Sequence, residues 1–271
     1  MISEDVARRG IVLVGCGRMG TALLRGWIGA GLAPGHVWVL EPKPGDWLRN
    51  SGVRLGESLP GSPAIIVLAV KPQLMAAALP SVAGFGGGPT LYLSIAAGTT
   101  LSAIEAAPGT GTPVVRAMPN TPAAIGQGIS AIVGNVAAGP EHLDLAETLM
   151  RAVGGVVRLD EEGQMDAVTA VSGSGPAYVF HLIETLAAAG EAEGLPAEMA
   201  LALARATVAG AGALAMEGGE SPARLREAVT SPNGTTEAGL EVLMPGEGGL
   251  GPLMRRTVAA AAARSRELAS G

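Results

Sequence analysis

Residues 11–24 read Ile11-Val-Leu-Val-Gly15-Cys-Gly17-Arg-Met-Gly20-Thr-Ala-Leu-Leu24. Four β-prone apolar residues run directly into a Gly-x-Gly-x-x-Gly turn, after which a helical pattern begins. This order is typical of a dinucleotide-binding unit: the first glycine permits the turn, the second admits a pyrophosphate, and the third lets the helix lie close to the strand. The first amides of the helix have no partner inside it and attract phosphate. The stretch therefore predicts a nucleotide site, and the alternative is an ordinary strand-to-helix turn without a ligand.

A second predicted strand, residues 36–40, ends in an acidic residue. Glu41 lies 41 − 20 = 21 residues after Gly20, where dinucleotide-binding units place the carboxylate that binds a ribose 2′-hydroxyl. This carboxylate would repel a 2′-phosphate and so favours NADH, whereas the cations Lys43 and Arg18 could offset that repulsion. The sequence therefore predicts NADPH or NADH as cofactor and leaves the preference open.

Composition excludes several other classes of protein. The chain has 271 residues, of which 48% are apolar and 15% charged, and its net charge of −6 leaves no basic stripe for nucleic acid. Because Cys16 is the single cysteine, no disulfide forms within the chain, and we expect a cytoplasmic protein. Cys16 is interpreted as a small turn residue and not as a catalytic thiol, since no neighbour that stabilises a thiolate is evident. The N-terminus lacks an apolar signal core, and prolines and glycines break the longest uncharged run, residues 72–104, so we expect no membrane span.

Strands and helices alternate up to about residue 160, which predicts an α/β domain, residues 1–160, with a doubly wound parallel sheet. After the first strand, further strands are expected at residues 36–40, 53–55, 64–70, 91–94, 113–117, 129–133 and 156–159, and helices include residues 72–79 and 140–153. Ligands of such sheets bind beyond the C-terminal ends of the strands. The loops at Gly15, Glu41, Lys71, Ala96 and Asn120 follow predicted strands, so we expect them to gather at one edge.

Residues 161–271 predict an all-α domain. Its helices are expected at residues 176–193, 196–216, 222–229, 237–244 and 250–268. Their faces are rich in alanine and glycine, which allows close approach between helices. These 271 − 160 = 111 residues make a small core on their own, so we expect a homodimer, with a bundle inside one chain as the alternative.

Side chains for strong acid–base or metal chemistry are scarce. His36, His142 and His181 show no catalytic pattern, and the sequence contains no Cys/His cluster with metal-ligand spacing. The loop 231–236 offers amides at a helix start together with three hydroxyls, which would hold a small carboxylate. From spacing alone, helix capping by these serine and threonine side chains is favoured over a ligand site. Residues 172–178, Ser-Gly-Ser-Gly-Pro-Ala-Tyr, allow either a close ligand or a helix junction.

Five segments together resemble the pyrroline-5-carboxylate reductase family, and the resemblance covers nearly the full chain. They are the glycine turn 15–20, Ala69-Val70-Lys71-Pro72, Met118-Pro-Asn120-Thr-Pro122, Asp166-Ala-Val-Thr169 with Ser172–Tyr178, and Val229-Thr-Ser231-Pro-Asn-Gly234-Thr-Thr236 through Gly239-Leu240. The last two are the most specific to the family. The resemblance implies a Rossmann-type domain, a helical domain that dimerises by interlocking, and the decamer known in the family.

The resemblance also implies a reaction, the reduction of the cyclic imine 1-pyrroline-5-carboxylate to L-proline, which is the last step of proline biosynthesis. An imine already accepts hydride, so the enzyme mainly has to hold C4 of the nicotinamide against the imine carbon. Thr236 matches the threonine near the substrate nitrogen and is the expected catalytic residue. The expected substrate-binding residues are Glu162, Ser231, Gly234, Thr235 and Thr236. The expected cofactor-binding residues are Gly15, Cys16, Gly17, Arg18, Met19, Gly20, Glu41, Ala69, Val70, Lys71, Pro72, Ala96, Ala97, Gly98 and Asn120.

Two positions depart from the family pattern, and two other classes compete. Arg18 stands where asparagine is common, and Asn233 where glycine is common. A β-hydroxyacid dehydrogenase would share the first half but normally carries a catalytic lysine on a helix of the second domain, and residues 164–216 contain no lysine. The other class is a nicotinamide-binding regulatory protein without turnover.

Overall fold

The computed structural model describes residues 4–56 and 58–270, which pack as two compact units. Unit 1 extends through Gly173 and takes up the chain again from Ala262, whereas unit 2 spans Ser174–Ala261. The first compact unit therefore extends beyond the domain boundary expected at residue 160. Unit 1 includes the end of the last helix, α12 (Leu250–Ser270), because Ser265 Oγ there donates a 2.6 Å hydrogen bond to Asp166 Oδ1.

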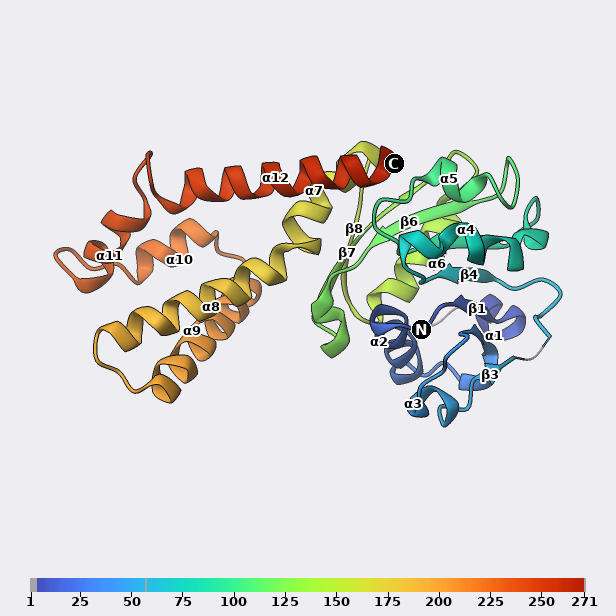
Figure 1. The fold of residues 1–271 in the computed structure, drawn as a ribbon, viewed down its shortest axis with the longest axis horizontal. Coiled ribbons are helices and arrows are strands. Elements are labelled where there is room, and N and C mark those ends of the chain that lie inside the picture. The colour runs from blue at the N-terminus through green and yellow to red at the C-terminus, as the bar shows by residue number, and fades with distance from the viewer. Residues whose placement is uncertain (1–3, 57, 271) are drawn as a thin grey trace. The chain divides into compact units, whose positions relative to one another are not determined.

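Unit 1 is built on one sheet, with strand order β3-β2-β1-β4-β5-β6-β7-β8 (Figure 1). The strands are β1 (Ile11–Val14), β2 (Val37–Leu40), β3 (Arg54–Leu55), β4 (Ile65–Leu68), β5 (Leu91–Ser94), β6 (Val114–Met118), β7 (Gly128–Gly134) and β8 (Gly154–Arg158). The predicted strands are confirmed with small shifts at their ends. In the parallel register, Leu13 of β1 pairs with Val39 on one side and with Val67 on the other.

Two strands, β7 and β8, depart from the predicted parallel arrangement. β7 runs antiparallel to β6, whereas all neighbours from β3 to β6 pair in parallel and β8 is parallel to β7. The connection from β6 to β7, residues 119–127, contains the short helix η5 (Thr121–Ile125). A parallel crossover needs about a dozen residues or more, so this shorter connection returns the chain in the opposite direction. The crossover from β7 to β8 does contain a full helix, α6 (Pro140–Arg151), and there the pairing is parallel.

The central strands β1, β4 and β5 are buried on both faces, as their continuous apolar sequences predict, whereas the edge strands β3 and β8 are not. On one face, α2 (Arg18–Gly29), α3 (Asp46–Arg49) and α6 cover side chains such as Leu13 and Val67. On the other face, α4 (Met75–Ala78), α5 (Leu101–Glu105) and α7 (Met165–Val168) cover alternate side chains such as Val14 and Leu68. The fully buried Trp27 joins α2 to α6, since its Nε1 donates to the carbonyl of Leu149 at 3.0 Å.

The helix expected at residues 72–79 is broken into short pieces. They are η2 (Pro72–Leu74), α4, η3 (Leu79–Ser81) and η4 (Ala83–Phe85). Pro72 begins the first piece and Pro80 lies within the third. Proline has no amide hydrogen to donate, so Pro80 prevents α4 from continuing as a regular helix.

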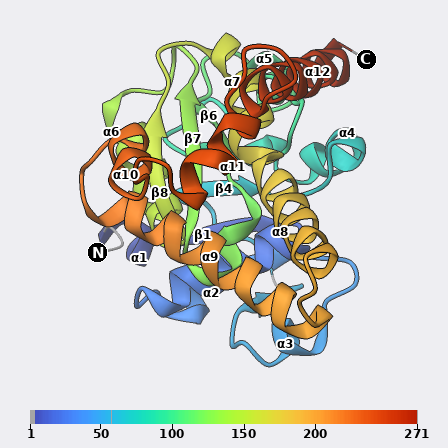
Figure 2. The ribbon, with the colours of Figure 1, turned by 90° about the vertical axis from the view of Figure 1, so that its left-hand side faces the viewer.

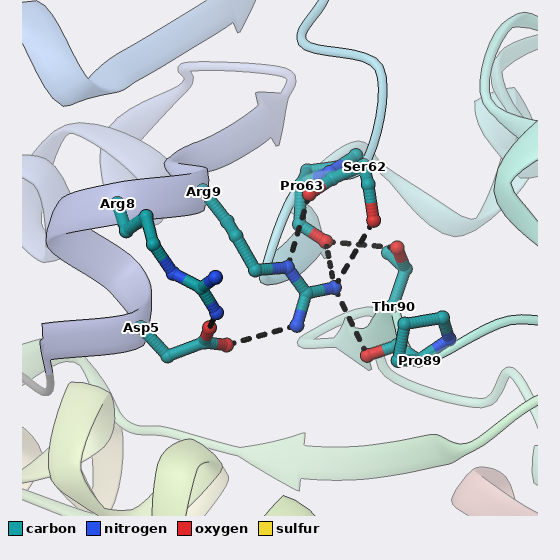
Figure 3. A network of polar contacts seen from close by, with 7 residues as sticks. All are labelled: Asp5, Arg8, Arg9, Ser62, Pro63, Pro89 and Thr90. Carbon is teal, nitrogen blue, oxygen red and sulfur yellow. Dashed lines mark hydrogen bonds and ion pairs between the residues drawn. The ribbon is translucent and has the colours of Figure 1, made fainter.

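An arginine cluster fastens α1 (Glu4–Arg9) to the edge where the parallel strands begin (Figure 3). Arg9 donates to the carbonyls of Ser62, Pro63 and Pro89 and pairs with Asp5 at 2.9 Å. Thr90 Oγ1 donates to the carbonyl of Pro63 in the same cluster. One guanidinium thus satisfies three carbonyls of the segments that lead into β4 and β5, at the edge opposite the predicted nucleotide loops.

Unit 2 consists of α8 (Gly175–Ala192), α9 (Ala197–Glu217), α10 (Pro222–Ala228), α11 (Thr235–Leu243) and the first part of α12. α8 and α9 pack against each other (Figure 2). Ser221 caps α10 as predicted, because its Oγ accepts a hydrogen bond from the amide of Arg224. α11 begins earlier than expected, at Thr235. Among the described residues, α9 is long and apolar enough to cross a membrane by length and composition alone, and 11% of its apolar window is buried.

Candidate active site

The glycine turn after β1 has the geometry that its sequence predicts. Gly15 adopts φ +85°, and its amide donates to the carbonyl of Leu40 at 2.8 Å. A Cβ on Gly17 would meet nothing within 4 Å, so the backbone there is open to a ligand. A Cβ on Gly20 would lie 2.7 Å from the carbonyl oxygen of Gly15, which shows how closely α2 packs on the turn. The three glycines therefore serve a left-handed turn, an open approach and a close helix contact.

The start of α2 is suited to an anion. Gly17 is its N-cap residue, and among the described residues no side chain caps the helix. Arg18, exposed at the first helical position, adds a positive charge, and Met19 follows it half-buried. Uncapped amides and the helix dipole both favour a negatively charged group at this end.

Cys16 is a turn residue and not an activated thiol. Burial raises the pKa of its Sγ above the ordinary value, and the nearby Glu41 carboxylate acts in the same direction. Thr21 Oγ1 lies 3.5 Å from Sγ and donates to the carbonyl of Cys16. A raised pKa disfavours the thiolate, which is the nucleophilic form.

Glu41 lies directly against the glycine turn. Its Oε2 accepts from the amide of Cys16 at 2.8 Å, and its Oε1 accepts from the amide of Lys43 at 3.0 Å. The carboxylate is thus held at the C-terminal end of β2, next to the open backbone of Gly17. A carboxylate oxygen has a second lone pair to offer to a hydroxyl.

The next loop follows β4. The amide of Ala69 donates to the carbonyl of Val14, and Val70 Cγ1 would lie 2.8 Å from a Cβ on Gly15. Lys71 and Pro72 are exposed at the start of η2. Since β1 and β4 are parallel neighbours, this loop lies beside the glycine turn.

The loop after β5 is held at both ends. The amide of Ala96 donates to Ser94 Oγ at 3.3 Å, and the amide of Leu101 donates to Glu162 Oε1 at 2.8 Å. Gly98 adopts φ +72°, and a Cβ there would lie 3.4 Å from the carbonyl oxygen of Leu268. Within residues 4–56 and 58–270, the amides of Ala97 and Gly98 have no hydrogen-bond partner. They are therefore able to bind an acceptor of a ligand.

The loop after β6 begins with a buried amide side chain. Asn120 Oδ1 accepts from the amide of Ile129 at 2.9 Å, which ties the end of β6 to the start of β7. Met118 also lies near the helical segment that follows, because a Cβ on Gly173 would be 2.7 Å from its Cε. Residues 172–178, for which a close ligand or a helix junction was expected, do form a junction: a π-helical turn, η7 (Thr169–Gly173), leads directly into α8.

In unit 2, the loop 231–236 is shaped by backbone contacts and one glutamate. The amide of Gly234 donates to the carbonyl of Ser231, and Glu237 Oε2 accepts from the amide of Asn233 at 2.6 Å. Asn233 adopts φ +57°, a left-handed conformation that asparagine tolerates better than most residues. A Cβ on Gly234 would lie 2.9 Å from the backbone carbonyl oxygen of Ser231 and 2.5 Å from its Oγ, so a larger residue there would force the loop to shift.

The expected capping of α11 by hydroxyls is wrong. Its N-cap residue is Gly234, with no side-chain cap. The hydroxyls of Ser231, Thr235 and Thr236 are exposed and have no hydrogen-bond partner among the described residues. The carboxylate of Glu237 accepts the hydrogen bond from the amide of Asn233 in their place, so these hydroxyls remain available to a ligand.

One notable residue of unit 1 was not identified from the sequence. Arg116 of β6 is 4% exposed and pairs with Glu162 Oε1 at 2.9 Å. The signal in the sequence was a single cation in the otherwise apolar strand Val-Val-Arg-Ala-Met. In the part of the chain that the structure describes, no group of His, Cys, Asp or Glu is arranged to hold a metal ion.

Two family models match the chain. Residues 162–268 match the model described as pyrroline-5-carboxylate reductase dimerisation, and residues 10–98 match the one described as NADP oxidoreductase, coenzyme F420-dependent. Among curated relatives, the pyrroline-5-carboxylate reductase of Pseudomonas aeruginosa is 38% identical over 265 residues, which is 96% of each chain. That of Methanosarcina acetivorans is 39% identical and covers 95% of this chain and 97% of its own.

Solved structures of pyrroline-5-carboxylate reductases have the same fold as this chain. A pyrroline-5-carboxylate reductase from Coxiella burnetii superposes with a TM-score of 0.90 at 34% identity, covering 96% of this chain and 98% of the other. The Plasmodium falciparum pyrroline carboxylate reductase with NADP bound gives a TM-score of 0.82 at 27% identity, with the same coverage. By identity over nearly its whole length, this chain belongs to the pyrroline-5-carboxylate reductase family.

Proposed function

We propose that this chain reduces the cyclic imine 1-pyrroline-5-carboxylate to L-proline, with NADPH or NADH as hydride donor. The observation that carries the proposal is that similarity to reductases of this name extends over both units, at 38% identity and 96% coverage. In the reaction a hydride adds to the imine carbon and a proton to the nitrogen, so that C=N becomes CH–NH. No strong base is needed, which agrees with the absence of a catalytic histidine or lysine pattern in the sequence.

The edge of the sheet in unit 1 supplies the groups for the dinucleotide. The open backbone of Gly17 and the uncapped start of α2 suit its pyrophosphate, and Glu41 suits a ribose hydroxyl. The free amides of Ala97 and Gly98 and the exposed Lys71 lie on loops at the same edge. When bound, the cofactor supplies the hydride. Arg18 and Lys43 offset the charge of Glu41, so we propose that both NADH and NADPH are used.

The loop 231–236 of unit 2 supplies the groups for the substrate. The amide of Thr235, at the start of α11, holds the carboxylate. Gly234 and Ser231 Oγ lie beside it, and the amide of Gly234 itself donates to the carbonyl of Ser231. Thr236 donates its hydroxyl hydrogen bond to the imine nitrogen or relays the proton that the nitrogen gains. Glu162 is proposed near the substrate through its second carboxylate oxygen, because Oε1 already accepts from Arg116 and Leu101.

We further propose that the protein is a cytoplasmic homodimer that assembles into a decamer. Unit 2 exposes many large apolar side chains, among them Phe180, Leu186, Leu203 and Leu214. A stable soluble protein rarely leaves such a surface uncovered. A second copy of the same unit would cover it, and this explains the apolar α9 without a membrane.

A single assay tests the proposed reaction. The protein is mixed with NADH or NADPH and pyrroline-5-carboxylate, and loss of absorbance by the reduced cofactor is followed together with proline formation. We expect proline to form in equal amount to the cofactor oxidised. Absence of turnover with both cofactors, in a protein that is folded and binds either of them, would refute the proposal.

A further inference from the structure

Arg116 is a buried cation whose position is not explained by packing. It lies on β6, on the face covered by α5 and α7, since its neighbours at alternate positions, Val114 and Met118, pack there. Its Nη1 donates to Glu162 Oε1 at 2.9 Å, whereas its buried Nη2 has no partner among the described residues. Leaving one nitrogen of a buried guanidinium unsatisfied costs free energy, so stability alone gives little reason for an arginine at this position.

The geometry shows what the arginine does. Glu162 Oε1 accepts from both Arg116 Nη1 and the amide of Leu101, the first residue of α5. Leu101 directly follows the loop 95–100, whose other end is held by Ser94 Oγ. Ser94 and Arg116 are register partners on β5 and β6. The buried hydroxyl of Ser94 thus fixes one end of the loop that carries Ala97 and Gly98, and Glu162, paired with the buried Arg116, fixes the other.

We propose that Arg116 is a positioning residue, which orients the Glu162 carboxylate so that the loop 95–100 keeps the shape that binds the nicotinamide cofactor. The inference rests on the proposed function for the identity of that ligand. Without the guanidinium, the partly exposed carboxylate of Glu162 turns toward water and releases the amide of Leu101. The amides of Ala97 and Gly98 then lose their fixed direction.

The test compares two arginines of unit 1. Arg9 is also largely buried and multiply bonded (Figure 3), but it contacts the segments that lead into β4 and β5, away from the loop 95–100, so R9M controls for the loss of a multiply bonded, partly buried arginine. We expect R116M to raise the dissociation constants of NADH and NADPH by about tenfold. R9M should change them by less than about twofold, even where it lowers the melting temperature as much. Hydrogen exchange of the free protein should become faster at the Leu101 amide in R116M only.

A conservative variant keeps the proposal testable if R116M does not fold. R116K retains the charge on a single donor nitrogen, so its dissociation constants should lie between those of wild type and R116M, about threefold above wild type. The proposal would be overturned if R116M and R116K had the same cofactor dissociation constants and the same exchange rate at the Leu101 amide as R9M. Neither cofactor binding nor hydrogen exchange requires the imine substrate. Failure of the wild type to form proline would therefore refute the proposed function without affecting this test.

Discussion

Replacing Gly20 with alanine tests whether the close packing of α2 on the glycine turn is required. The added Cβ would lie 2.7 Å from the carbonyl oxygen of Gly15, whereas ordinary contact begins at 3.4 Å. Relief needs a displacement of about 3.4 − 2.7 = 0.7 Å, and the obstacle is backbone, so no rotamer change provides it. Overpacking of this kind costs about 1–3 kcal/mol, and for a unit of this size each kcal/mol lowers Tm by about 2–4 °C.

The assay is thermal unfolding of G20A together with the dissociation constant of NADPH. We expect a lower Tm and weaker binding, because the helix carries the turn with it. G29A is the matched control: it lies at the end of the same helix with nothing within 4 Å of its Cβ, and alanine there should stabilise by up to about 1 kcal/mol. A G20A variant that unfolds within about 1 °C of wild type and binds NADPH equally well would refute this reasoning.

Two further predictions concern charge. E41A removes the carboxylate held beside the turn and should raise kcat/KM for NADPH relative to NADH by about tenfold; an unchanged ratio in steady-state assays means that Glu41 does not face the ribose. Arg151 and Arg158 donate to Glu147 and lower its pKa, so its contribution to stability is present above an unfolded pKa of about 4.3 and is lost as the pH falls through the lower folded pKa. The Tm difference between wild type and E147Q should therefore be largest near neutral pH and vanish in acid, and a difference that persists at pH about 3 contradicts this assignment.

Local patterns in the sequence predicted the elements whose causes are local. The glycine turn is an example, because Gly15 is needed for the left-handed turn and Gly20 for the close helix contact, and the spacing of the glycines reveals both. The direction of β7, and with it that of β8, was missed, since it depends on the length of the connection 119–127 and not on the apolar pattern of the strands. The capping of α11 was missed because Glu237 reaches back to Asn233 in place of the hydroxyls.

The candidate site shows the same division. Residues at strand ends, such as Glu41 and Lys71, follow from the order of strands in a parallel sheet. The pair Arg116 and Glu162 joins positions 162 − 116 = 46 residues apart in the chain, and no periodicity or spacing rule connects them. The roles expected for Thr236 and its loop came from family resemblance and stay predictions.

The most direct test of the account is the kinetics of T236A with pyrroline-5-carboxylate. If Thr236 serves the imine nitrogen, kcat should fall by about 10²-fold while the dissociation constant of NADPH changes by less than about twofold, and T236S should recover most of the rate. A kcat close to that of wild type would contradict the account, as would a parallel loss of turnover and cofactor affinity.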